Sequence, residues 1–89
     1  MLAKEKKREL AAKAHSLNPV VMTGAKGITE NLVQEMHAAL EAHELIKVRV
    51  NAADRDDRQA MVDELANLTQ AEHIKTIGHV AIFYRKRRD

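Results

Sequence analysis

Residues 19–30 read Pro-Val-Val-Met-Thr-Gly-Ala-Lys-Gly-Ile-Thr-Glu, and three structural signals follow one another within them. The apolar run of residues 19–23 is typical of a buried strand. Gly24 and Gly27 then enclose a short loop. Thr29 is a favourable start for a helix, because a threonine side chain can accept a hydrogen bond from a free amide of the first turn, and the acidic Glu30 is favourable in that turn. The stretch therefore predicts a strand, a glycine loop and a helix in succession, as in an α/β fold.

The residues on either side add further elements. Residues 2–17 predict a basic helix that stops before Pro19, because a residue that precedes proline avoids the helical region. The helix that begins at Thr29 continues to about His43. In residues 45–50 apolar and basic side chains alternate, as is typical of a half-buried strand. The apolar positions at helical spacing are Leu10, Ala14 and Leu17 in the first helix, and Leu32, Val33, Met36, Ala39 and Leu40 in the second.

The C-terminal half adds one more helix and two strands. Asp54 is the expected N-cap of this helix, and residues 73–77 form a third strand. Residues 80–84 are apolar on both faces, which predicts the centre of a sheet covered on each side. We expect the second and third helices to cover one face and the first helix to cover part of the other. The third helix has the apolar stripe Met61, Val62, Leu65 and Leu68, and Met22, Met36 and Met61 are expected to pack in the core.

Length and composition limit the function. The 89 residues predict a single domain over residues 1–89, which is too small for a deep active-site cavity. The chain has no cysteine, no signal peptide and no apolar span, so we expect a reducing cytoplasm and no membrane partner. The five histidines lack ligand spacing, and no nucleophile stands beside a base. We therefore expect no metal, no cofactor, no small-molecule substrate and no enzyme activity.

Charge is segregated along the chain although the formal net charge is only +2. Residues 1–27 carry six bases and two acids, and residues 73–89 carry five bases and one acid. Residues 28–45 carry four acids and no base, and residues 54–72 carry six acids and two bases. A polyanion could therefore bind the basic ends and the glycine loop while acidic elements face away. The alternative is that these runs are ordinary solvated surface.

The loop Gly24–Gly27 has the pattern Gly-x-x-Gly between a strand and a helix. Two glycines permit a positive φ and let a nucleic-acid backbone approach without a Cβ in the way. The loop amides and the positive end of the following helix can then face a phosphate, with Lys26 adding a mobile charge. The same pattern also forms simple flexible turns, and Glu30 partly neutralises the helix end. Phe83 and Tyr84 are the only aromatic residues and cannot form the stacking platform of an RNA-recognition motif (RRM) or an OB-fold, so recognition should rely mainly on backbone and shape.

Several of these motifs together resemble one family. They are Ala14-His15-x-Leu17-x-Pro19-Val20-Val21-x-x-Gly24-x-x-Gly27-Ile28-Thr29-Glu30, then Leu45-Ile46-Lys47-Val48, then Ile77-Gly78 and Tyr84-Arg85. They resemble the CRM domain (chloroplast RNA splicing and ribosome maturation), which occurs in bacteria as stand-alone YhbY proteins. The resemblance implies a two-layer α/β fold like the C-terminal domain of translation initiation factor 3. It also implies a mixed four-stranded sheet of order 1-2-4-3, with the last strand antiparallel to the others.

The family's Gly-x-x-Gly loop carries over to Gly24, Ala25, Lys26 and Gly27. The implied partner is structured RNA, namely ribosomal RNA or a precursor of the large (50S) ribosomal subunit. The alternative is a protein adaptor whose basic surface meets an acidic partner. We expect residues 85–89 to form a polar tail whose removal largely preserves the fold. The predicted RNA contacts are Gly24, Ala25, Lys26 and Gly27 of the loop, Lys6, Lys7 and Lys13 of the first helix, and Arg85, Lys86, Arg87 and Arg88 of the tail.

Overall fold

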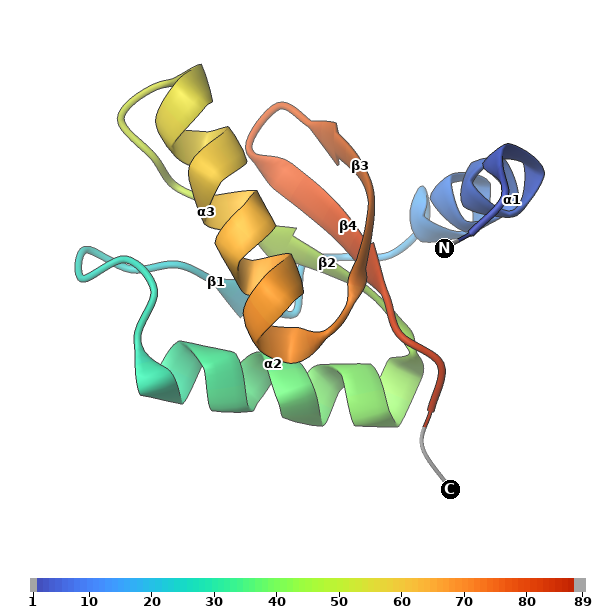
Figure 1. Cartoon of the computed structure of the whole chain (residues 1–89), viewed down its shortest axis with the longest axis horizontal. Helices are drawn as coiled ribbons and strands as arrows, with labels where there is room; N and C mark the ends of the chain where they lie inside the picture. Colours follow the sequence, from blue (N-terminus) through green and yellow to red (C-terminus); the bar gives the residue numbers. More distant parts are fainter. Residues whose placement is uncertain (1, 88–89) are drawn as a thin grey trace.

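The computed structural model describes residues 2–87, which form three helices and four strands in the predicted order (Figure 1). The helices are α1 (Lys4–Ala14), α2 (Glu30–His43) and α3 (Arg55–Thr69). The strands are β1 (Val21–Met22), β2 (Leu45–Arg49), β3 (Glu72–Ile77) and β4 (Val80–Tyr84).

The strands form one mixed sheet of order β1-β2-β4-β3. β1 runs parallel to β2, and β4 is antiparallel to both of its neighbours. β4 is therefore central, as its two apolar faces predict, and its residues Ala81, Ile82 and Phe83 are buried. Between His73 and Lys75 the pairing of β3 with β4 shifts by one residue, which marks a β-bulge.

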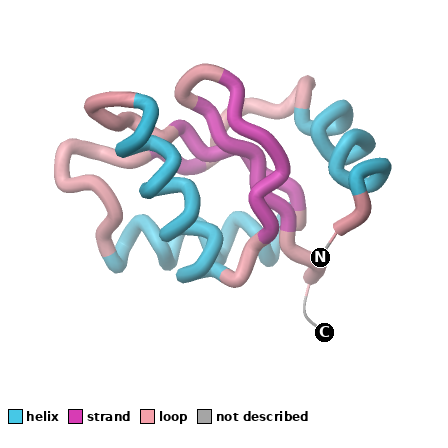
Figure 2. The backbone as a smooth tube through the Cα atoms, turned by 45° about the horizontal axis from the view of Figure 1, so that its top comes forward, coloured by secondary structure: helices cyan, strands magenta, loops and turns pink. Residues whose placement is uncertain are grey.

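Helices α2 and α3 cover one face of the sheet, and α1 lies against the other (Figure 2). Leu10 and Ala14 of α1 are buried, at 3% and 0% exposure. Side chains alternate along a strand, so Ile82 faces α1 while its neighbours Ala81 and Phe83 face α2 and α3. The main core consists of Leu32, Met36 and Leu40 of α2, Val62 and Leu65 of α3, Val21, Ile46 and Val48 of β1 and β2, Val50, and Ala81 and Phe83 of β4.

Two helix starts agree with the sequence prediction. The Thr29 hydroxyl accepts the amide of Leu32 at 3.1 Å, so Thr29 is the N-cap of α2. The Asp54 carboxylate accepts the amide of Asp57 at 2.8 Å and caps α3 in the same way. Each cap satisfies one of the amides that a helix leaves free in its first turn.

Three apolar residues that the sequence assigns to the core are exposed instead. Helix α1 ends at Ala14, and Leu17, in the segment that leads to Pro19, is 37% exposed. Strand β1 is only two residues long, and Met22 on its outer side is 60% exposed. Leu68 is 48% exposed, because the last turn of α3 buries Thr69, whose hydroxyl donates to the carbonyl of Leu65 at 2.7 Å.

Within residues 2–87, no helix is both long and apolar enough to cross a membrane. The same residues contain no cluster of three or more histidine, aspartate or glutamate side chains placed to hold a metal ion.

Candidate nucleic-acid interface

The glycine loop is a tight turn at the end of β1. The amide of Gly27 donates to the carbonyl of Gly24 at 3.0 Å and closes the turn. Gly27 has φ +71°, a left-handed conformation that L side chains rarely adopt. The second glycine of the motif is therefore required by the backbone itself, whether or not a ligand binds.

The tip of this turn presents unpaired backbone to solvent. Among the described residues, the amides of Ala25 and Lys26 donate to no protein acceptor. A Cβ added at Gly24 or Gly27 would meet no heavy atom within 4 Å, so both glycines border open space. Lys26 is exposed and takes part in no ion pair within residues 2–87. The loop thus offers free amides and one mobile cation without steric cover, which suits a phosphate group.

A buried threonine holds the base of the loop. Thr23 is 1% exposed, and its hydroxyl accepts the amide of Asn51 at 2.8 Å. The Asn51 side chain also donates to the carbonyl of Thr23 at 2.9 Å. These two hydrogen bonds from Asn51 fix the loop to the segment between β2 and α3. No local sequence pattern predicts them, because the partners are 28 residues apart.

The surroundings of the loop are hollow on two sides. One hollow of about 420 Å³ lies toward α2 and is lined by Lys26, Asn31 and Glu35. Another of about 520 Å³ lies toward the segment after β2 and is lined by Asn51, Ala52 and Ala53. Glu35 and Glu30 lower the positive potential on the α2 side. The hollow toward residues 51–53 has no charged residue in its lining, whereas Lys26 lines the hollow toward α2 together with Glu35.

Arg49 is a second exposed base near the loop, and the sequence analysis did not single it out. It ends β2 in register with Met22, two residues before Gly24. Its carbonyl accepts the amide of Thr23 at 3.0 Å. The sequence indicates only that Arg49 lies on the polar face of a half-buried strand, and does not indicate that this face is near the loop.

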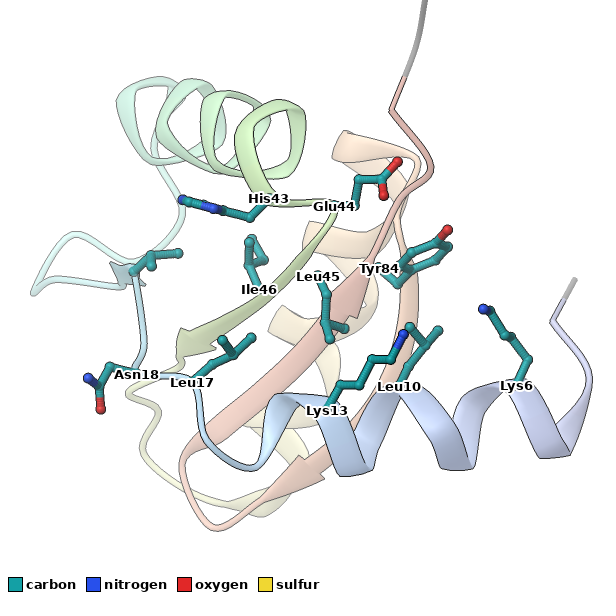
Figure 3. Close-up of a pocket in the computed structure, with 11 residues that line it drawn as sticks. Lys6, Leu10, Lys13, Leu17, Asn18, His43, Glu44, Leu45, Ile46 and Tyr84 are labelled. Atoms are coloured by element: carbon teal, nitrogen blue, oxygen red, sulfur yellow. The ribbon is translucent and has the colours of Figure 1, made fainter.

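Helix α1 and the glycine loop lie at opposite ends of the molecule's long axis (Figure 1). The lysines of α1 therefore do not join the loop in one small site. Lys6 and Lys13 extend from α1 toward the sheet, where they border a groove (Figure 3). Lys7 forms an ion pair with Glu72 of β3 at 3.4 Å.

Arg85 is buried, in contrast to the expectation that residues 85–89 form a polar tail. It is only 8% exposed, and its Nη1 donates to the carbonyl of Thr69 at 2.7 Å and to His37 Nδ1 at 2.9 Å. Because a guanidinium can only donate, His37 Nδ1 is the acceptor in this contact. Arg85 Nη2 also lies 3.5 Å from a carboxylate oxygen of Glu41. The residue ties the end of β4 to α2 and α3, so its guanidinium already has acceptors within the protein.

Arg87 is exposed but is also used within the protein. Its Nε donates to the carbonyl of Glu41 at 2.8 Å, and its Nη2 donates to the carbonyl of Ala42 at 2.9 Å. These are carbonyls at the C-terminal end of α2, where positive charge is favoured. Lys86 is exposed, and Arg88 lies outside the described residues.

The fold and the loop together define a class of protein. It is a small α/β domain in which a strand, a Gly-x-x-Gly turn and a capped helix follow one another along the chain, and in which the last strand is central in the sheet and antiparallel to its neighbours. A family profile described as the CRS1/YhbY (CRM) domain matches residues 2–85. The chain belongs to this family, and the resemblance seen in its motifs is confirmed.

Similar proteins have been named for RNA. A Haemophilus influenzae protein named RNA-binding protein is 44% identical over 84 residues, which cover 94% of this chain and 85% of that protein. YqeI of Bacillus subtilis, named a probable RNA-binding protein, is 33% identical over 89 residues, covering 100% and 93%. The solution structure of a hypothetical Staphylococcus aureus protein, titled as a candidate RNA-binding protein, has a TM-score of 0.88 and 34% identity, covering 100% and 93%.

Proposed function

We propose that this protein is a non-enzymatic RNA-binding domain that grips the RNA backbone with the loop Gly24–Gly27. The ligand we propose is ribosomal RNA, bound free or within a precursor of the large ribosomal subunit in the cytoplasm. Membership of the CRS1/YhbY family and the names of its relatives support RNA as the class of ligand. The geometry of the loop supports the mode of binding.

One observation carries the mode of binding. The turn at Gly24–Gly27 exposes two free amides and an unpaired lysine over open space, while Thr23 holds its base in place. Amides that have no protein acceptor and lie in an ordered turn are suited to phosphate oxygens, because the protein has already fixed their positions. Such contacts fix the position of an RNA without reading its sequence.

The spacing of the basic groups favours a folded RNA over a short single strand as the complete ligand. The Cα positions extend over 33 × 28 × 23 Å, and the loop and α1 lie at opposite ends of the long axis (Figure 1). A helical RNA presents phosphates along such a length, and proteins that recognise RNA by shape use contacts of this reach. We propose that the loop and α1 contact separate parts of one folded RNA.

Crosslinking in cells, followed by mapping of the RNA contacts, tests this proposal. We expect crosslinks to large-subunit ribosomal RNA and co-sedimentation with precursor particles that nuclease treatment abolishes. The Lys26→Ala variant should reduce both. Co-sedimentation that survives complete RNA digestion would instead identify a protein adaptor with an acidic partner, and would refute RNA binding as the function.

A further inference from the structure

A groove of about 540 Å³ runs along one side of α1, where the helix meets the outer face of the sheet (Figure 3). Its floor is formed by Leu45 of β2 and Tyr84 of β4, which are paired neighbours in the sheet. Leu17 and Val20 also line it, and they are 37% and 52% exposed although both are apolar. The groove is therefore an open apolar slot on the face of the sheet that α2 and α3 do not cover.

Contacts toward the N-terminus of helix α1 and past its C-terminal end attach it to the sheet. Toward its N-terminus, Lys7 pairs with Glu72 of β3 at 3.4 Å. Past its C-terminal end, Lys47 Nζ donates to the carbonyl of Leu17 at 3.0 Å and to that of His15 at 3.4 Å. Between these contacts Leu10 is buried. These contacts fix the position of α1 on the sheet, and the groove between them is therefore a feature of the packed fold.

The walls of the groove favour an anion. Lys6 and Lys13 are seven positions apart, so they lie on the same side of α1 as Leu10, and both line the groove. Neither forms an ion pair within residues 2–87. Glu44 is the acid in the lining, and its Oε2 accepts the amide of Arg87 at 2.6 Å. The Arg87 guanidinium also covers carbonyls at the adjacent end of α2, which would otherwise repel an anion.

Tyr84 gives the groove an aromatic surface. It is half-buried, whereas its neighbour Phe83 is fully buried on the opposite face of β4. A tyrosine ring beside leucine side chains is a suitable support for one nucleobase, since every base has a π-face. The apolar floor with its one aromatic ring suits a nucleobase, and the two free ammonium groups suit the phosphates of the nucleotide.

We propose that the groove between α1 and the sheet binds an unpaired nucleotide of RNA, with its base against Tyr84 and its flanking phosphates at Lys6 and Lys13. The nucleotide must be unpaired, because a base inside a duplex keeps its faces stacked on its neighbours. This inference rests on the proposed function, in that RNA is the ligand. It adds a second contact, remote from the glycine loop, that holds a looped-out base.

The first arm of the test measures the ring directly. Tyr84 is the only tyrosine of the chain, and there is no tryptophan. We expect a single-stranded oligouridylate to shift the Tyr84 ring-proton resonances upfield, and a blunt RNA duplex to leave them unchanged. Tyr84→Leu should weaken oligouridylate binding by about 5- to 100-fold, the range of one base–aromatic stack. Tyr84→Phe keeps the ring and should bind within about twofold of the parent.

The second arm uses matched charge variants of one helix. The double variant Lys6→Ala/Lys13→Ala removes the two groove lysines and should weaken oligouridylate binding by about 10- to 30-fold at 0.1 M salt. The control Lys4→Ala/Arg8→Ala removes the same charge from the side of α1 that faces away from the groove, and should change the affinity by less than about twofold. All four side chains are exposed, so neither double variant should unfold the protein.

The outcomes separate the groove from the proposed function. If the parent binds ribosomal RNA but the oligouridylate leaves Tyr84 unshifted, the groove proposal is wrong while the proposed function stands. Equal losses in the two double variants would also overturn it, since net charge alone would then explain binding. If the parent binds neither RNA, both proposals fail. If only polyglutamate shifts Tyr84, the groove is a site for an acidic protein.

Discussion

The glycine loop and the C-terminal segment both carry basic residues, but the protein uses them differently. Lys26 in the loop is exposed and unpaired within residues 2–87. Arg85 is 8% exposed and donates to Thr69, His37 and Glu41, and Arg87 donates to the end of α2. Lys26 presents its charge to solvent, whereas Arg85 and Arg87 use theirs in contacts within the protein.

The number of basic residues in a segment therefore does not measure how much positive charge the segment offers a phosphate. A guanidinium has five donors and can be consumed by carbonyls at a helix end. A lysine at the tip of a turn has no such acceptors within reach. The loop should therefore affect RNA binding, and Arg85 should mainly affect folding.

The largest expected effect is on stability, at Arg85. Arg85→Ala leaves the buried Thr69 carbonyl and His37 Nδ1 without a donor, and should lower the free energy of unfolding by about 2–4 kcal/mol. Urea denaturation measures this loss. Lys86→Ala, one residue on and exposed, is the control and should change stability by less than about 0.5 kcal/mol. Unchanged stability with reduced RNA affinity in Arg85→Ala would place Arg85 at the RNA and reverse the comparison.

The next effect is on RNA binding, at Gly27. Gly27→Asp puts a carboxylate where a phosphate should lie, and should weaken ribosomal RNA binding by about tenfold or more. It should also cost about 1–2 kcal/mol of stability, because Gly27 has φ +71°. Gly78→Asp is a matched control with φ +60° in the turn between β3 and β4, and should show the strain without the loss of binding. Equal binding losses would mean that backbone strain or net charge is responsible, not the loop.

A smaller effect is expected at Lys26. Lys26→Ala removes about one phosphate contact, so the slope of log K against log salt should decrease in magnitude by roughly 0.7–0.9. Lys75→Ala, on β3 at the opposite edge of the sheet from β1, removes the same charge from an exposed position and should leave the slope unchanged. A slope that is identical in both variants and the parent would reduce the loop to a simple turn.

The smallest expected effect is on the pH dependence of folding stability, and it does not involve RNA binding. Burial beside Phe83 lowers the pKa of His73 below its usual 6.5, and this outweighs the opposing effect of nearby hydrogen bonding and carboxylates. The unfolded chain therefore binds a proton more readily, and the contribution of neutral His73 to stability is lost as the pH falls from 6.5 through the lowered pKa. Melts across this window should show a steeper loss in the parent than in His73→Gln. Parallel curves would contradict the assignment.

Much of this protein was determined by the sequence itself. The order of elements, the caps Thr29 and Asp54 and the central position of β4 follow from local spacing, from side chains that bond within their own turn, and from a strand apolar on both faces. The strand, glycine turn and helix are also local, since Gly24 bonds to Gly27 three residues on. These interactions join residues that are at most a few positions apart, so the local sequence is enough to predict them.

The tertiary structure alone decided how each basic group is used. Arg85 is buried against His37, which lies 48 residues earlier, and Thr23 is bonded to Asn51, 28 residues later. The groove beneath Lys6 and Lys13 exists only because α1 packs across strands from the other end of the chain. Whether a charge is free or satisfied depends on acceptors that folding brings from distant residues, and no spacing within a segment of sequence records them.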